Sequence, residues 1–199
     1  MQTPTTETTG PATGAAPRSG RPRTVAYWAV TLVMAYELAS GSVWNLIPIE
    51  WIEAQLRHLG YPHHFAYLIG VWQVGAVAVV VAPRLALVKE WAYAGCFFLW
   101  SGAVVAHLVA GDGVRSWGVP LVFVLVGVAS WALRPADRRL PETRLRHRET
   151  RTGDWEARPR AWAVPIGILA ALYAVSFLTL PAMDDLTREW AVENGWTEE

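Results

Sequence analysis

The chain lacks most of the residues and motifs on which soluble enzymes depend. It has one cysteine, Cys96, so a single chain can form neither an internal disulfide nor a dithiol redox centre. Lysine is equally scarce, with Lys89 the only one, and charged residues make up 17% of the sequence. We find no glycine-rich phosphate loop, serine nucleophile elbow, haem-attachment signature or metal-ligand pair of known spacing. The sequence therefore gives no support to a soluble-enzyme function.

Apolar residues, by contrast, make up 53% of the 199 residues, and 12 are tryptophan. They gather in five runs, each close to the roughly 20 residues that a helix needs to cross a bilayer. The runs cover residues 25–47, 65–82, 91–110, 117–133 and 161–180. This pattern predicts an all-α fold, a polytopic transmembrane helical bundle.

Proline and glycine stand where these helices are expected to end. Pro83 follows the second run, residues 111–113 follow the third, and Pro135 and Pro181 follow the fourth and fifth. Pro120 suits the first turn of the fourth helix. Between the first two runs, residues 48–59 carry apolar residues at helical spacing, which predicts a short amphipathic helix that either lies on the membrane surface or caps the bundle.

The remaining segments are polar and differ in charge. We expect residues 1–24 to be a disordered cytoplasmic tail, since they have almost no large apolar side chain, although a cleaved signal peptide is a competing interpretation of this start. Residues 136–160 form an Arg-rich cytoplasmic loop that either sets topology or attracts anionic lipid. Residues 181–199 are expected to be an acidic extracytoplasmic tail.

The basic residues alternate across the expected spans. Fourteen Arg and Lys residues fall on the side of the N-terminal tail and three on the other side. Because cytoplasmic loops carry the excess of positive charge, the N-terminus is predicted to be cytoplasmic and the C-terminus extracytoplasmic.

Three ordered motifs resemble the DoxX-like family of small bacterial integral membrane proteins. They are HLGYP at 58–62, KEWAYAG at 89–95 and GAVVAHLVAGD at 102–112. The resemblance covers about residues 27–135 and implies a four-helix bundle in the bacterial inner membrane at 25–135, to which residues 161–180 add a fifth transmembrane helix. The family name comes from proteins associated with thiosulfate oxidation and quinone reduction, but the resemblance carries over no agreed catalytic residue.

Three polar residues are expected near the middle of the bilayer. Glu37 lies about 18 Å along the first helix, where a charge is costly. Gln73 and Ser101 fall near the middle of the second and third helices, so the three are expected to share one polar layer. That layer either binds a ligand or carries a proton, or it fixes the helix register by hydrogen bonds.

A second group is expected at the outer face. His107 ends the third helix and Asp112 follows five residues later, while the fold is expected to bring His58, His63, His64 and Asn45 to the same level. Imidazoles near a carboxylate suit proton transfer or a grip on a quinone carbonyl, and the alternative is a capped helix end. No metal site is predicted, because the spacing matches no established pattern.

Two functions remain open at this stage. The first is an accessory or docking subunit of a membrane assembly, embedded in the lipid bilayer and contacting a membrane protein partner or a second copy, with no role for nucleic acid. The alternative is a subunit of a membrane oxidoreductase that handles a quinone or another small hydrophobic ligand. The sequence leaves open whether the protein is an enzyme.

Overall fold

The computed structural model describes residues 21–135 and 159–196, and all regular structure within them is helical. The six helices are α1 (Arg21–Leu46), α2 (Glu50–His58), α3 (His64–Val81), α4 (Ala86–Ala110), α5 (Val114–Leu133) and α6 (Pro159–Glu193). Most of the expected N-terminal tail and of the Arg-rich loop lies outside the described residues, as do residues 197–199. The tail was expected to reach residue 24, but α1 already begins at Arg21.

The predicted helical membrane bundle is confirmed. Four helices, α3, α4, α5 and α6, are each long and apolar enough to cross a membrane. α1 meets the same measure only together with α2, from which it is bent by 86°, so the bundle has four spans or up to five. The short helix expected at 48–59 is α2.

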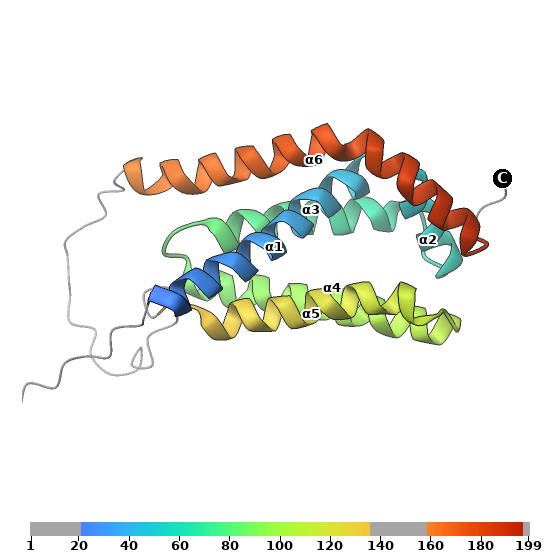
Figure 1. The fold of residues 1–199 in the computed structure, drawn as a ribbon, viewed down its shortest axis with the longest axis horizontal. Helices are drawn as coiled ribbons and strands as arrows, with labels where there is room; N and C mark the ends of the chain where they lie inside the picture. The colour runs from blue at the N-terminus through green and yellow to red at the C-terminus, as the bar shows by residue number, and fades with distance from the viewer. Residues whose placement is uncertain (1–20, 136–158, 197–199) are drawn as a thin grey trace, which may run out of the picture.

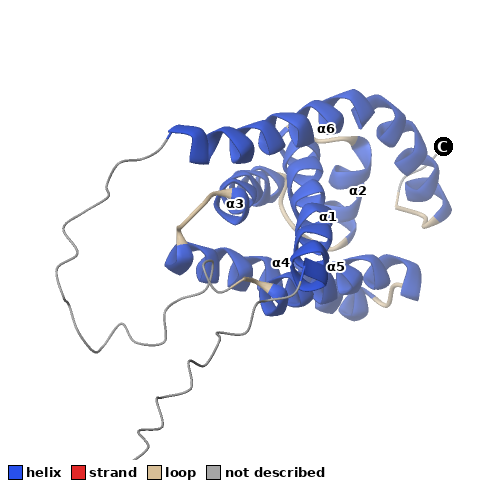
Figure 2. Cartoon of the chain, turned by 60° about the vertical axis from the view of Figure 1, so that its left-hand side comes forward, coloured by secondary structure: helices blue, strands red, loops and turns tan. Residues whose placement is uncertain are grey.

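α1 lies at the centre of the bundle, where it packs against α3, α5 and α6. Figure 1 shows α6 across one side of α1 and the α4–α5 pair on the other, and Figure 2 shows the same arrangement after a turn of the molecule. In the first half of α1, buried residues recur every three or four positions, at Tyr27, Thr31, Met34 and Leu38, which keeps one stripe of the helix against its neighbours. From Leu38 to Val43 every residue is buried, so this part of α1 is enclosed on all sides.

Four helices, α1, α4, α5 and α6, are longer than the sequence predicts, and in α5 and α6 the extra length changes where their prolines lie. α5 begins at Val114, so Pro120 lies inside the helix and not in its first turn. α6 runs for 35 residues and passes through both Pro165 and Pro181, although Pro181 was expected to end it. Proline inside a membrane helix is tolerated where neighbouring groups satisfy the freed backbone. The second half of α6 bends towards α2, so the segment after Pro181 covers one end of the bundle (Figure 1).

Candidate functional site

The inward face of α4 carries a polar group at each level of the bundle. Its buried residues are Lys89, Tyr93, Cys96, Trp100 and His107. Tyr93, Trp100 and His107 are seven residues apart, which is close to two helical turns, so they lie on one stripe. The three side chains therefore mark three levels along the bundle. We call the level at the start of α1 the inner level and the level at the end of α4 the outer level, as names for position along the bundle only.

At the middle level Trp100 faces Glu37 of α1. The indole Nε1 donates a 3.4 Å hydrogen bond to Glu37 Oε1. Glu37 Oε2 is shielded from solvent and has no hydrogen-bond partner among the described residues. A buried carboxyl oxygen without a partner is costly, so Glu37 is one of the least satisfied polar groups of the bundle.

Gln73 belongs to a separate contact between α1 and α3. Asn45 Nδ2 donates to Gln73 Oε1 at 3.2 Å and to the Gly41 carbonyl at 2.7 Å. The Gln73 amide fills the space above Gly41, where an added Cβ would lie 2.5 Å from Gln73 Nε2. This contact joins α1 to α3, as expected of a hydrogen bond between packed helices.

Ser101 does not join this group. Its hydroxyl donates to the Phe97 carbonyl of its own helix at 2.6 Å. Ser101 follows Trp100 by one position, which rotates its side chain by about 100° from the buried stripe. The expected layer of Glu37, Gln73 and Ser101 is thus two separate contacts and one serine on another face.

The outer level brings His107, Asp112 and His58 together. The Asp112 carboxylate accepts a 2.6 Å hydrogen bond from His107 Nδ1 and a 2.9 Å bond from His58 Nε2. Gln55 Nε2 lies 3.3 Å from His107 Nε2. Burial raises the pKa of Asp112, but the hydrogen bonds and charge of His107 and His58 outweigh it and hold that pKa below its ordinary value. The three groups form one connected unit from a half-buried imidazole to a fully buried one.

The turn after α4 explains how Asp112 reaches His107. The Asp112 amide donates to the His107 carbonyl, and the Gly111 amide donates to that of Leu108. This is a Schellman turn, and Gly111 has the positive φ, 82°, that the turn requires. The chain reverses within five residues, so the Asp112 side chain returns to the imidazole at the helix end.

The end of α6 closes over the same unit. The Trp196 ring stacks on His58 and on His107, with centroids 5.1 and 5.9 Å away. A second Schellman turn, with Gly195 at φ 69°, directs Trp196 back onto the bundle. Trp196 also contacts Trp51 of α2 at 4.8 Å. No sequence motif predicts this cover, because it depends on α6 continuing past Pro181.

The other residues expected at this level lie elsewhere. Asn45 is bound to Gln73, as described above. His63 contacts Tyr67 at 3.2 Å and Glu53 at 3.5 Å, and His64 is exposed. Within the described residues, no group of three or more His, Cys, Asp and Glu side chains is placed to hold a metal ion.

The inner level contains polar contacts that sequence reasoning missed. Tyr93 and Thr31 both hydrogen-bond to the buried hydroxyl of Ser130, at 2.8 and 2.7 Å. Close by, Arg134 pairs with Glu90 at 2.8 Å and its guanidinium lies over the Tyr93 ring. Arg134 is one of the fourteen basic residues that the sequence places on the side of the N-terminal tail, yet its side chain is 3% exposed.

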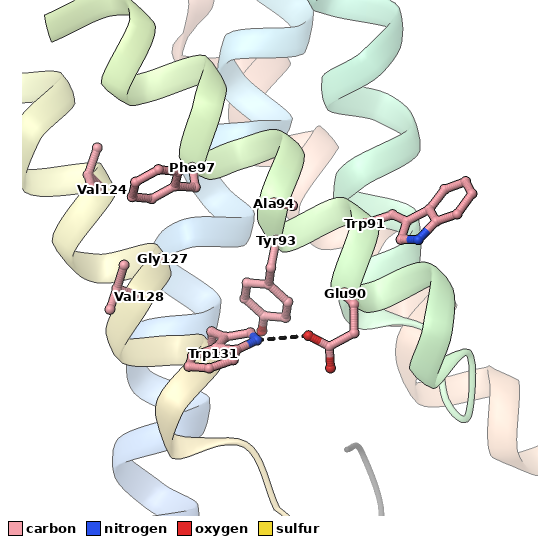
Figure 3. Close-up of a pocket in the computed structure, with 9 residues that line it drawn as sticks. All are labelled: Glu90, Trp91, Tyr93, Ala94, Phe97, Val124, Gly127, Val128 and Trp131. Atoms are coloured by element: carbon pink, nitrogen blue, oxygen red, sulfur yellow. Dashed lines mark hydrogen bonds between the residues drawn. The ribbon is translucent and has the colours of Figure 1, made fainter. Parts of the chain in front are cut away.

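A groove opens beside this inner network, between α4 and α5. Its volume is about 450 Å³, and its walls are mostly apolar and aromatic. Figure 3 shows Phe97 beside Val124, and the indole of Trp131 pointing to Glu90, to which it donates a 2.8 Å hydrogen bond. The lining residues are Glu90, Trp91, Tyr93, Ala94, Phe97, Val124, Gly127, Val128 and Trp131. The groove therefore has mostly apolar walls and one polar end, which Glu90 and Trp131 form.

Comparison with known proteins identifies a family. The model of the DoxX-like family matches residues 29–130, which is about half of the chain. No curated protein and no solved structure matches the chain.

Proposed function

Because the chain belongs to the DoxX-like family of membrane proteins, we propose that it is an accessory subunit of a membrane assembly and that it holds a small amphipathic molecule in the α4–α5 groove. The ligand class that we expect is a quinone. This proposal joins the two functions that the sequence left open, since the same bundle would contact a partner and carry the ligand.

The groove carries this proposal. Its 450 Å³ falls within the range of about 300–1,000 Å³ that is usual for small-molecule sites, which are mostly apolar with a few polar groups. At its polar end the Glu90 carboxylate accepts hydrogen bonds from the Trp131 indole and from Arg134, and its remaining lone pairs can accept one from a hydroquinone hydroxyl. An aromatic ring suits Tyr93 and Phe97, and an isoprenoid tail would extend along the apolar walls.

The charges at the polar end of the groove favour a neutral ligand over a charged one. Arg134 pairs with Glu90 and is itself almost fully buried, so the end of the groove carries opposite charges in direct contact. The side chain of Glu90 is 27% exposed. A neutral ligand with donors and acceptors fits such a pair better than a charged one.

We further propose that this end of the bundle faces the cytoplasm of a bacterial cell. The start of α1, the α3–α4 connection and the end of α5 meet here (Figure 1). These are segments to which the charge count assigns most of the Arg and Lys residues. The headgroup would then be bound near the cytoplasmic surface of the inner membrane, with the C-terminus on the opposite side.

A binding measurement with a filled groove tests the proposal. Ala94 is exposed in the groove and Ala170 is exposed on α6, so Ala94→Trp and Ala170→Trp add the same side chain at a test and a control position. With a short-chain benzoquinone and detergent-purified protein, native mass spectrometry should show one bound molecule in the wild type and in Ala170→Trp. Ala94→Trp should weaken binding by tenfold or more, and Glu90→Gln should weaken it to a smaller extent.

Two results would count against a ligand role. Equal binding to Ala94→Trp and the wild type would remove the groove as the site. No binding to the folded wild type would remove the quinone and leave the docking function, for which the next step is to identify the partner by cross-linking.

A further inference from the structure

The C-terminal ends of α2, α4 and α6 meet at the end of the bundle opposite to the groove. His58 comes from α2, His107 from α4, Asp112 from the turn after α4, and Trp196 from the turn after α6. We call these four residues the imidazole clasp. The groove-lining residues are separate from it, so its role is independent of the function proposed above.

The hydrogen bonds limit the protonation states that the clasp can adopt. Asp112 accepts from both imidazoles, which requires a carboxylate with each oxygen free to accept. If both imidazoles are neutral, His107 holds its proton on Nδ1 and its Nε2 accepts from the Gln55 amide. The clasp then has a net charge of −1, and one more proton would neutralise it.

His58 is the site that can accept this proton without breaking a contact. Its side chain is 29% exposed, whereas that of His107 is 2% exposed. A proton on His107 Nε2 would face the Gln55 amide nitrogen, so the amide would have to turn over. The other nitrogen of His58, Nδ1, has no hydrogen-bond donor opposite it among the described contacts, so it can take up a proton.

A positive charge on His58 would strengthen its stacking contact with the Trp196 ring. Both imidazole planes lie nearly parallel to the indole, at 21° and 17°. A cationic ring stacked on tryptophan is attracted to its π face in addition to the dispersion contact. We propose that the imidazole clasp is a proton-binding site that fastens the C-terminal part of α6 to the ends of α2 and α4.

Three ion pairs lie at this end of the bundle, and Arg57, next to His58 in the sequence, is exposed. The pairs are Arg115 of α5 with Glu193, Arg188 of α6 with Glu50, and Glu53 with His63. The first two pairs join α6 to α5 and α2, and their members are 43–64% exposed, so they add little by themselves. The stacked Trp196 is therefore the contact of α6 that depends on histidine protonation.

Titration of the histidine rings by NMR, on the full chain in detergent micelles, tests proton binding. Asp112→Asn removes the carboxylate to which His58 donates, so His58 should bind its proton more weakly than in the wild type. Glu53→Gln is the matched control, because it removes the carboxylate beside His63 and should change the titration of His63 alone. An unchanged His58 titration in Asp112→Asn would overturn the proposed site.

Hydrogen exchange tests whether protonation of the clasp holds the C-terminal part of α6 more firmly. After correction for intrinsic rates, the amides of residues 187–196 should exchange several-fold more slowly at about pH 6 than at about pH 8 in the wild type. Trp196→Leu should abolish this difference, whereas Trp190→Leu should keep it, because Trp190 contacts Trp51 and Arg115 and not the imidazoles. Equal exchange at the two pH values in the wild type would show that the clasp does not respond to protons.

Discussion

The ammonium group of Lys89 lies 2.6 Å from the carbonyl oxygen of Val80, and at the same distance from that of Val79. Both carbonyls belong to the last turn of α3, where no further helical N–H is available. The lysine is fully buried, and its positive charge also suits the negative end of the helix dipole. The only lysine of the chain thus joins the start of α4 to the end of α3.

Replacement of Lys89 by methionine should destabilise the bundle. The carbonyls of Val79 and Val80 would lose a charged donor, at a cost of about 1–3 kcal/mol. Arg84→Met is the matched control, because Arg84 is exposed in the same connection. Thermal unfolding in detergent should show a lower midpoint for Lys89→Met and a nearly unchanged one for Arg84→Met. Equal midpoints for the two variants would mean that the buried ammonium contributes no net stability.

Close packing of α1 on α3 leads to a second prediction. Gly41→Ala would place a Cβ against the Gln73 amide, so the amide must move and its bond to Asn45 weakens. We expect a loss of about 1 kcal/mol. Gly75→Ala is the control, since nothing lies within 4 Å of the added atom. Denaturant unfolding of both variants measures the difference. The Gly41→Ala cost should shrink when Gln73 is also alanine, because coupled residues are not additive.

The helices of this fold are the part that the sequence predicts well. Apolar runs near bilayer length and the motifs at 58–62, 89–95 and 102–112 are local signals, and both the bundle and the family are found. The end of α6 was placed wrongly at Pro181 because proline is an unreliable stop where neighbouring groups satisfy the backbone.

Side-chain contacts were predictable only where they are local. His107 and Asp112 are five residues apart, so a helix followed by a glycine turn brings them together. Ser101 was grouped with Glu37 by depth alone, and depth does not say which way a side chain points around the helix. Arg134 and Glu90 are 44 residues apart, and their pairing follows from the packing of α4 on α5, which no local pattern encodes.

Glu37 provides a third prediction. Glu37→Gln keeps an oxygen that accepts from the Trp100 indole and removes the ionisable group, so the bundle should fold with unchanged stability. Glu37→Leu leaves the indole N–H unsatisfied and should cost about 1–3 kcal/mol. The thermal midpoints of the two variants separate a hydrogen-bonding role from a need for charge. If Glu37→Gln were as unstable as Glu37→Leu, the fold would require the ionised carboxylate.

Acid stability gives the last prediction, which concerns Asp112. Its lowered pKa means that the fold favours the carboxylate, because His107 and His58 donate to it. The resulting stabilisation is complete above the ordinary aspartate pKa of about 3.9 and is lost as the pH falls through the lower value in the folded protein. Between about pH 5 and pH 2.5 the wild type should therefore lose more stability than Asp112→Asn, measured by the unfolding midpoint in detergent. Glu193→Gln, which removes an exposed partner of Arg115, should follow the wild type. If Asp112→Asn fell as steeply as the wild type, the acid sensitivity would come from other carboxylates and the two imidazoles would not stabilise this one.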